Sequence, residues 1–263
     1  MSKYGFNAGI ARNHTESEHP NLWRGLYSLF SPRCGTQGAK LINYGLNGGA
    51  GSLSATGATW VPSDRGRAVS LNGTTGTVNW TQNKTVSTPN ATFIAWVKPL
   101  ATLPEFTGIM ISRASSLMGL MVSNHASRPL TCLWVGAEYS ANTGLSFTTG
   151  LWHMCAATIH GATLTIYLCS AAGIKTYAPA LSSTTNTLAG AWWLGVDPAA
   201  PGARNWPGLI GDSYIYTRAL GKSEIMQVFS GASPLTPRRQ PVVYFNSGAA
   251  PAANTTNFFR FFR

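Results

Sequence analysis

The chain has 263 residues, of which 44% are hydrophobic and only 10% are charged, so it can fill a large core but must build its surface mainly from uncharged polar residues. The N-terminal residues lack the apolar segment of a secretory signal, and no stretch approaches the roughly 20 apolar residues that span a membrane. The net charge is +11, yet the basic residues are scattered and not clustered as in a groove-reading helix, which argues against specific nucleic-acid binding.

The first segment, residues 1–20, is polar and without periodicity, and it is predicted to be an extended arm. From residue 21 to residue 230, short strand-like runs alternate with Gly, Pro, Asn and Ser. Along residues 92–98, for example, Phe93 and Val97 fall on one face of a strand and Trp96 falls on the other. The turn spacing is that of a sandwich or a barrel and not of βαβ units. Residues 21–230 are therefore predicted to form one all-β domain.

The four cysteines, Cys34, Cys132, Cys155 and Cys169, lack both CxxC spacing and metal-ligand pairing. Cys155 and Cys169 fall in neighbouring strands of a predicted hairpin, so a disulfide between them is one interpretation. Buried free thiols are the favoured prediction, because free cysteine is among the residue types most often buried.

One helix is predicted near the end of the domain, in "LGKSEIMQVF", residues 220–229. With Gly221 as N-cap, the carboxylate of Glu224 can reach back to the Gly221 N–H, as in a capping box. Ile225 and Val228 then form the buried stripe together with Phe229.

The last segment, residues 231–263, is rich in Pro, Ala, Ser and Asn and is predicted to be an extended arm. It ends in "FFRFFR", in which a helical turn would place the phenylalanines on one arc and the arginines opposite. Six residues are too few for a stable isolated helix. The tail is therefore predicted to become ordered only against a partner, with folding back onto its own domain as the alternative. The predicted docking residues are Arg238, Arg239, Phe258, Phe259, Arg260, Phe261, Phe262 and Arg263.

Several motifs occur in the order expected of one known family. "NWPGLIGDSYIYTRALGKSEIMQVF" (205–229), "GLWHMCAATIHGATLTIYLCS" (150–170), "GRAVSLNGTTGTVNW" (66–80) and "PNATFIAWVKP" (89–99) together resemble the laminin-G-like domains of the concanavalin A-like lectin/glucanase superfamily, of the kind found in phage structural proteins. The resemblance covers roughly residues 19–230. It implies a jelly-roll sandwich of two antiparallel sheets with one short helix near its C-terminal end.

The resemblance also bears on metal binding and catalysis. Calcium-binding members usually carry acids in the segment matching "LNGTTGTV", where this chain has Asn72, Thr74 and Thr75, so only Asp212 remains as a candidate ligand for a structural calcium. The glucanase branch places its carboxylates in an E-x-D-x-x-E strand motif, which is absent here. No cofactor and no catalysis are therefore predicted.

Aromatic side chains are the remaining candidates for ligand binding, since tryptophan rings can stack on sugars. Trp192, Trp193 and Trp206 are the carbohydrate candidates, and packing in the core is the competing role. Adjacent strand residues point to opposite faces, so at most one of Trp192 and Trp193 can be exposed on a given face.

Three functions are considered. The favoured one is a non-catalytic virion structural protein, a capsid decoration or tail/fibre component. It would fold in the host cytoplasm, present a lectin-like domain and attach through its terminal arms to a capsid or tail protein of the same particle or to copies of itself. The alternative is a bacterial carbohydrate-binding lectin or adhesin, extracellular or at the cell surface, recognising a surface glycan. A glycoside hydrolase is the third and least favoured.

Overall fold

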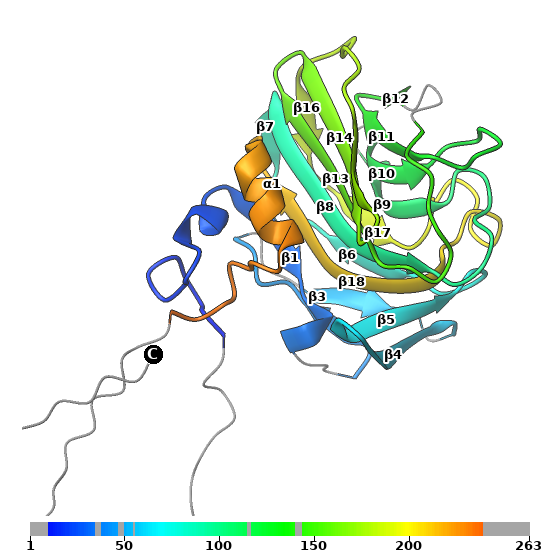
Figure 1. The fold of residues 1–263 in the computed structure, drawn as a ribbon, viewed down its shortest axis with the longest axis horizontal. Coiled ribbons are helices and arrows are strands. Elements are labelled where there is room, and N and C mark those ends of the chain that lie inside the picture. The colour runs from blue at the N-terminus through cyan, green and yellow to red at the C-terminus, as the bar shows by residue number, and fades with distance from the viewer. Residues whose placement is uncertain are drawn as a thin grey trace, which may run out of the picture.

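The computed structural model describes residues 10–34, 38–46, 50–54, 56–114, 117–139 and 144–238. Two large antiparallel sheets dominate it, with one helix near the C-terminal end (Figure 1), as the sequence predicts for a jelly-roll sandwich. The first sheet has the order β15 (Gly173–Tyr177), β14 (Thr163–Ser170), β13 (His153–His160), β8 (Asn90–Pro99), β18 (Pro207–Tyr216), β5 (Gly66–Asn72), β4 (Ala58–Ser63), and β1 (Leu26–Phe30) also pairs with β18.

The second sheet has the order β12 (Ala137–Tyr139), β11 (Leu130–Trp134), β10 (Met118–Val122), β9 (Gly108–Ser112), β17 (Ala191–Leu194), β6 (Val78–Thr81), β3 (Ala50–Leu53), β2 (Lys40–Ile42). A separate ribbon joins β7 (Val86–Thr88) and β16 (Asn186–Leu188). The remaining elements are two short 3-10 helices, η1 (Pro20–Trp23) and η2 (Pro32–Cys34), and the helix α1 (Lys222–Phe229).

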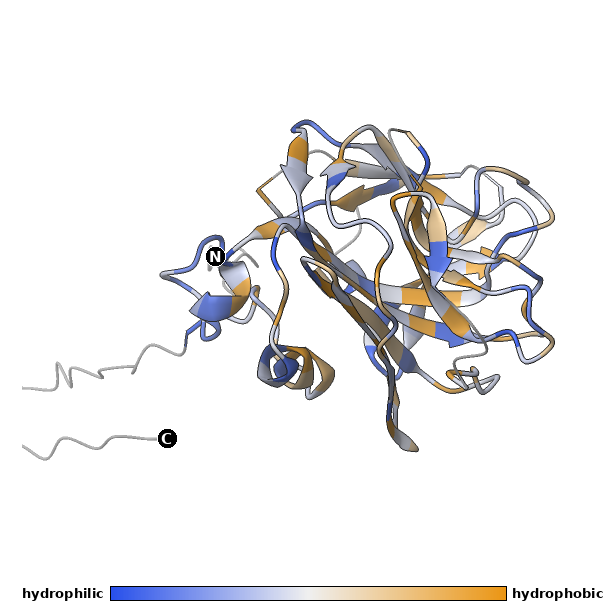
Figure 2. Cartoon of the chain, turned by 90° about the horizontal axis from the view of Figure 1, so that it is seen from above, coloured by the Kyte–Doolittle hydropathy of each residue, from blue (hydrophilic) through white to orange (hydrophobic). Residues whose placement is uncertain are grey.

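The main core lies between the two sheets. Phe93 of the first sheet packs against Trp134 and Trp192 of the second, with ring centroids 6.1 and 5.7 Å apart. In Figure 2, hydrophobic positions recur along the strands, while much of the hydrophilic colour lies in loops. Alternating burial along the strands of the second sheet leaves the side opposite this core open to solvent at β17, β6 and β3.

The outer face of the first sheet is covered as well. Ile94 and Trp96 of β8 pack there with Ile225 and Val228 of α1 and with Leu22 of η1. Both faces of β8 are therefore buried, which is why its sequence is almost continuously apolar. Figure 1 shows α1 lying against this side of the sandwich.

The helix is capped as its sequence predicts. The backbone N–H of Gly221 donates to Glu224 Oε2 over 3.0 Å. Ile225 and Val228 are buried, and Phe229 stacks on Trp96 with centroids 5.8 Å apart. The capping carboxylate also accepts two hydrogen bonds of 2.7 Å from Arg218, a contact that the motif alone does not reveal. These hydrogen bonds hold the pKa of Glu224 below its ordinary value.

The described ends of the two predicted arms pair with each other. We call residues 10–24 and 232–238 the terminal lobe. Ala11 donates its N–H to the Leu235 carbonyl over 2.9 Å, and Ser17 forms a β-bridge with Pro237. Leu235 is buried against the outer face of the first sheet. Figure 1 shows the two strips of chain side by side, so the folded part extends beyond the predicted limits of 21–230 at both ends.

The register of β13 and β14 settles the state of the hairpin cysteines. Cys155 pairs with Leu168, and Cys169 pairs with Met154, so the two thiols are one residue out of step. Cys155 points into the core between the sheets and Cys169 points to the outer face of the first sheet. All four cysteines are free, as the favoured reading predicts, and burial raises the pKa of Cys169 to about 11.

Within the described residues, no helix is long and apolar enough to cross a membrane.

Candidate functional site

A row of polar and aromatic side chains lies on the open side of the second sheet. Ser52 of β3 is paired with Asn79 of β6, and Asn79 is paired with Trp193 of β17. Ser52 and Asn79 are exposed, and Trp193 is partly exposed. Because directly paired residues lie about 5 Å apart, the three side chains form a continuous strip. Thr81, two residues after Asn79 on the same face, is exposed beside it.

The strip ends where loops begin to cover the sheet. Trp193 is paired on its other side with Ile111 of β9, which is fully buried. Ile111 forms a small cluster with Met121 and Leu133, against which Phe106 and Leu117 pack. Trp193 therefore lies at the boundary between the part of this sheet face that loops cover and the part that is exposed to solvent. An aromatic ring at such a boundary is suited to an elongated ligand that lies across the strands.

Two of the three predicted carbohydrate residues lie elsewhere. Trp192 and Trp206 are both 0% exposed, so neither can stack on a sugar. Trp192 packs on Trp80 with centroids 6.0 Å apart, and Trp206 meets Phe147 edge-on at 5.6 Å. Their assignment as sugar-stacking residues is wrong, since both belong to the core, and Trp193 alone of the three has solvent access.

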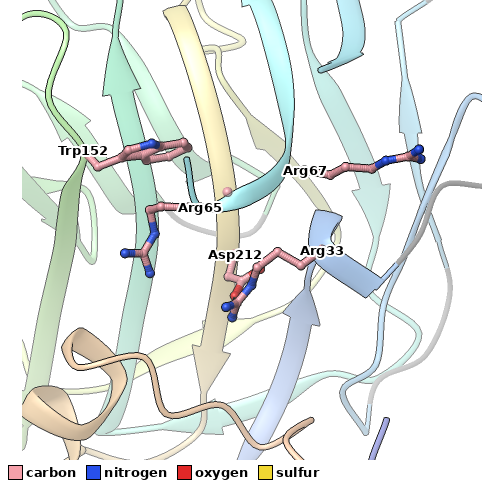
Figure 3. Close-up of a pocket in the computed structure, with 6 residues that line it drawn as sticks. Arg33, Arg65, Arg67, Trp152 and Asp212 are labelled. Carbon is pink, nitrogen blue, oxygen red and sulfur yellow. The ribbon is translucent and has the colours of Figure 1, made fainter. Parts of the chain in front are cut away.

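Asp212, the predicted calcium ligand, faces a cation of the protein itself. Its carboxylate forms an ion pair with Arg33, and it accepts a 2.8 Å hydrogen bond from Ser31 Oγ. Figure 3 shows the Arg33 guanidinium against the carboxylate, while the guanidinium of Arg67 points away. Arg65 lies close by, its guanidinium carbon 3.3 Å from the centroid of the Trp96 ring. This cationic pocket does not fit a calcium ion.

In the segment where calcium-binding family members carry acids, the polar side chain of Asn72 is used in hydrogen bonds within its own turn. Asn72 Oδ1 accepts backbone N–H bonds from Thr74, Thr75 and Gly76 at 3.0, 2.9 and 2.9 Å. This side-chain oxygen therefore shapes its own turn. Across the described residues, no group of three or more His, Cys, Asp or Glu side chains comes together. The donors that are present do not fit a calcium site.

A buried ionic cluster that the sequence does not reveal lies between β9 and the chain leading to β18. Asp197 is 0% exposed and accepts two hydrogen bonds from Arg113, of 2.6 and 2.8 Å, and one of 2.8 Å from Arg204. Burial by itself raises the pKa of Asp197, but the bonds from Arg113, Ala199 and Arg204 outweigh it and leave the pKa below its ordinary value. Arg113 is 84 residues away in sequence, so no local pattern could pair them.

Most of the acidic side chains are already paired with cations. Five of the eight acids form ion pairs with basic side chains, namely Asp64, Glu105, Asp197, Asp212 and Glu224. His153 is buried, and its Nε2 accepts the Thr148 N–H over 3.0 Å. Burial lowers the pKa of His153. The strip on the open side of the second sheet, by contrast, offers the Trp193 indole, the Asn79 amide and the hydroxyls of Ser52 and Thr81. These groups suit ligand binding.

Comparison with solved structures identifies the fold. Domain 4 of AbnA, a GH43 extracellular arabinanase from Geobacillus stearothermophilus determined in complex with arabinotriose, is similar with a TM-score of 0.57 and 18% identity, over 77% of this chain and 97% of that one. Trypanosoma rangeli sialidase is similar with a TM-score of 0.53 and 15% identity, over 78% of this chain but only 32% of the sialidase, so this chain spans about a third of that enzyme.

At the level of sequence, none of the curated proteins is significantly similar to this chain. A family model, that of the concanavalin A-like lectin/glucanases superfamily, matches residues 72–226, which is more than half of the 263 residues. The match runs from the end of β5 into α1 and takes in the strand that bears Trp193. The chain belongs to the concanavalin A-like lectin/glucanases superfamily.

Proposed function

We propose that this protein is a non-catalytic glycan-binding domain whose sugar lies on the strip Ser52–Asn79–Trp193. The observation that carries the proposal is that the strand register places an exposed hydroxyl, an exposed amide and a partly exposed indole side by side on three neighbouring strands. The C–H face of a pyranose or furanose packs on an aromatic ring, while amides and hydroxyls take up the ring hydroxyls. The fold supports this assignment, since AbnA domain 4 was determined with arabinotriose.

The ion pairs support a binding role over catalysis. Glycoside hydrolysis ordinarily needs two carboxyl groups, about 5 to 10 Å apart and on either side of the scissile bond, one of them protonated. Asp197 and Glu224 have pKa values held below their ordinary range, which is opposite to what a general acid needs. Incubation of the protein with the glycans that it binds is expected to release no reducing sugar. Release that a Trp193 variant abolishes would overturn this part of the proposal.

The position of the terminal lobe supports attachment through the chain ends. The lobe packs on the outer face of the first sheet, and the strip lies on the open side of the second, so the two occupy opposite sides of the sandwich. Our finer proposal is therefore a decoration or tail component of a virion, held at the lobe and presenting the strip outward. Mass spectrometry of purified particles from the source is expected to detect the chain. Its absence from particles would leave a free lectin or adhesin.

The test of the strip is a single substitution. Trp193→Ala removes the stacking surface and is expected to weaken glycan binding by about 5- to 30-fold, because stacking and aromatic burial are worth about 1 to 2 kcal/mol. Trp193→Phe keeps an aromatic ring and is expected to retain most of the binding. Binding is measured first on a glycan array and then by calorimetry with the best oligosaccharide. Equal affinity of the wild-type protein and Trp193→Ala would rule out the strip as the sugar site.

A further inference from the structure

A pocket that the glycan strip does not use lies between the N-terminal part of the terminal lobe and Leu46. Its volume is about 460 Å³, within the range of natural binding pockets. It lies where the N-terminal segment meets the sandwich, on the side away from Trp193. The side chains that matter for its chemistry are Arg12, His14, Pro20, Trp23, Arg24 and Leu46.

One wall of the pocket is fixed by local hydrogen bonds. Asn13 Oδ1 accepts N–H bonds from Thr15 and Glu16, at 2.9 and 3.2 Å, and thereby closes a turn. Glu16 Oε2 in return accepts the Arg12 N–H over 2.8 Å. The turn is tied to the rest of the lobe, because the Arg238 N–H donates to the Glu16 carbonyl over 2.6 Å. The wall is therefore formed before anything binds.

Part of the pocket lining is apolar. Trp23 donates its indole N–H to the Pro234 carbonyl over 2.7 Å, so the polar atom of this side chain is satisfied inside the lobe. Leu46 is 66% exposed, the highest value among the exposed large hydrophobic side chains of the described residues. Pro20 completes this surface. A large apolar side chain that entered here would remove Leu46 from water, with a gain of about 25 cal/mol per Å² of apolar surface buried.

The pocket lining also carries two cationic side chains, Arg12 and Arg24. Arg12 and Arg24 are both exposed, and neither forms an ion pair with a carboxylate of the described residues. No acidic side chain of the described chain lines the pocket. The nearest acid in sequence, Glu16, uses its carboxylate to hold the turn. Two exposed guanidinium groups and an apolar surface in one pocket favour a partner that carries carboxylates on either side of an apolar side chain.

We propose that this pocket is a docking site for an acidic polypeptide segment of another protein. The segment inserts a leucine or phenylalanine side chain against Trp23 and Leu46 and places carboxylates on Arg12 and Arg24. A second occupant to consider is the Phe-rich segment 258–263 of the chain itself. That segment would bring Arg260 and Arg263 to a pocket that already holds Arg12 and Arg24, so charge disfavours it.

The test uses the full chain and a fluorescent hexapeptide of sequence EELFEE, followed by anisotropy at low salt. Binding is expected, and it should weaken as salt rises. Arg12→Glu with Arg24→Glu is expected to weaken it by about tenfold, since the two exposed pairs are together worth up to about 2 kcal/mol. The matched control is Lys175→Glu with Lys222→Glu, which makes the same charge change at exposed sites outside the pocket and should leave binding unchanged.

Three results would overturn the proposal. One is equal binding of the peptide KKLFKK, which would mean that charge plays no part. Another is equal binding of EELFEE by the wild type and the arginine variant, with the unchanged melting temperature of the variant showing that it is folded. The last concerns the chain's own tail. If changing the four phenylalanines at 258, 259, 261 and 262 to serine raises the affinity for EELFEE about tenfold, the tail is the natural occupant.

Discussion

Replacing Asp197 by asparagine is expected to lower the free energy of unfolding by about 3 kcal/mol, near the low end of what breaking a buried ion pair costs. The carboxylate is completely buried, and it accepts hydrogen bonds from Arg113 and Arg204. Asparagine would leave both guanidinium groups without their counter-charge. The two arginine side chains are 33% and 29% exposed, so part of their charge can be solvated again, which keeps the effect below the upper end of the range.

The same carboxylate sets a pH dependence, whose sign follows from the direction of its pKa shift. The folded-state pKa of Asp197 is below the ordinary value of 3.8, so the unfolded chain binds the proton more readily than the folded chain. The stabilisation from Asp197 is therefore fully present above the unfolded pKa and is lost as the pH falls below about 4. Between pH 7 and pH 3 the stability of wild type should fall more than that of Asp197→Asn.

Both effects are measured by urea unfolding at pH 7 and pH 3, with Asp64→Asn as the matched control. Asp64 is also paired with a cation, Lys98 at 3.8 Å, but its side chain is 65% exposed. An exposed pair contributes about 1 kcal/mol or less, so this variant should unfold close to wild type. Equal destabilisation by the two substitutions would mean that the burial of Asp197 does not matter.

Local sequence patterns were sufficient to predict individual strands and the helix. The alternation along residues 92–98 predicts a strand and β8 is one, and the capping pattern at Gly221 and Glu224 predicts the helix and its first hydrogen bond. Both depend on interactions within a few residues. The family resemblance then supplied what local patterns could not, the pairing of two sheets. The match of residues 72–226 to the family model confirms it.

The candidate site was predicted only in part, because exposure depends on contacts between distant segments. The position of Trp206 next to Pro207 is typical of an exposed loop, yet its side chain is completely buried. Ser52 and Asn79 carry no distinguishing motif, and only the strand register aligns them with Trp193. Local patterns do not reveal the terminal lobe for the same reason, since residues 10–24 and 232–238 lie at opposite ends of the sequence. The Phe-rich tail at 258–263 lies outside the described residues, and its predicted docking role stays a prediction.

The adjacent tryptophans of β17 provide the sharpest test of which side of the second sheet is the core. Trp192→Ala is expected to destabilise the protein by about 3 to 5 kcal/mol, since it removes a fully buried indole from its contacts with Trp80 and Phe93. Trp192→Phe should have a smaller effect, because the indole N–H that it removes is buried and has no hydrogen-bond partner in the described structure.

Trp193→Ala, one residue along, should change stability by only about 1 kcal/mol, as expected for a partly exposed side chain. The measurements are urea unfolding for stability and calorimetry with the oligosaccharide for binding, made on each variant. Because successive side chains of a strand point to opposite faces, the Trp192 variant should lose stability and the Trp193 variant should lose glycan binding. If Trp193→Ala unfolded the protein as readily as Trp192→Ala, the strip would be a second packed face and the proposed glycan site would be lost with it. If Trp192→Phe instead abolished binding in a protein of wild-type stability, the sugar would contact the side of β17 that the structure assigns to the core.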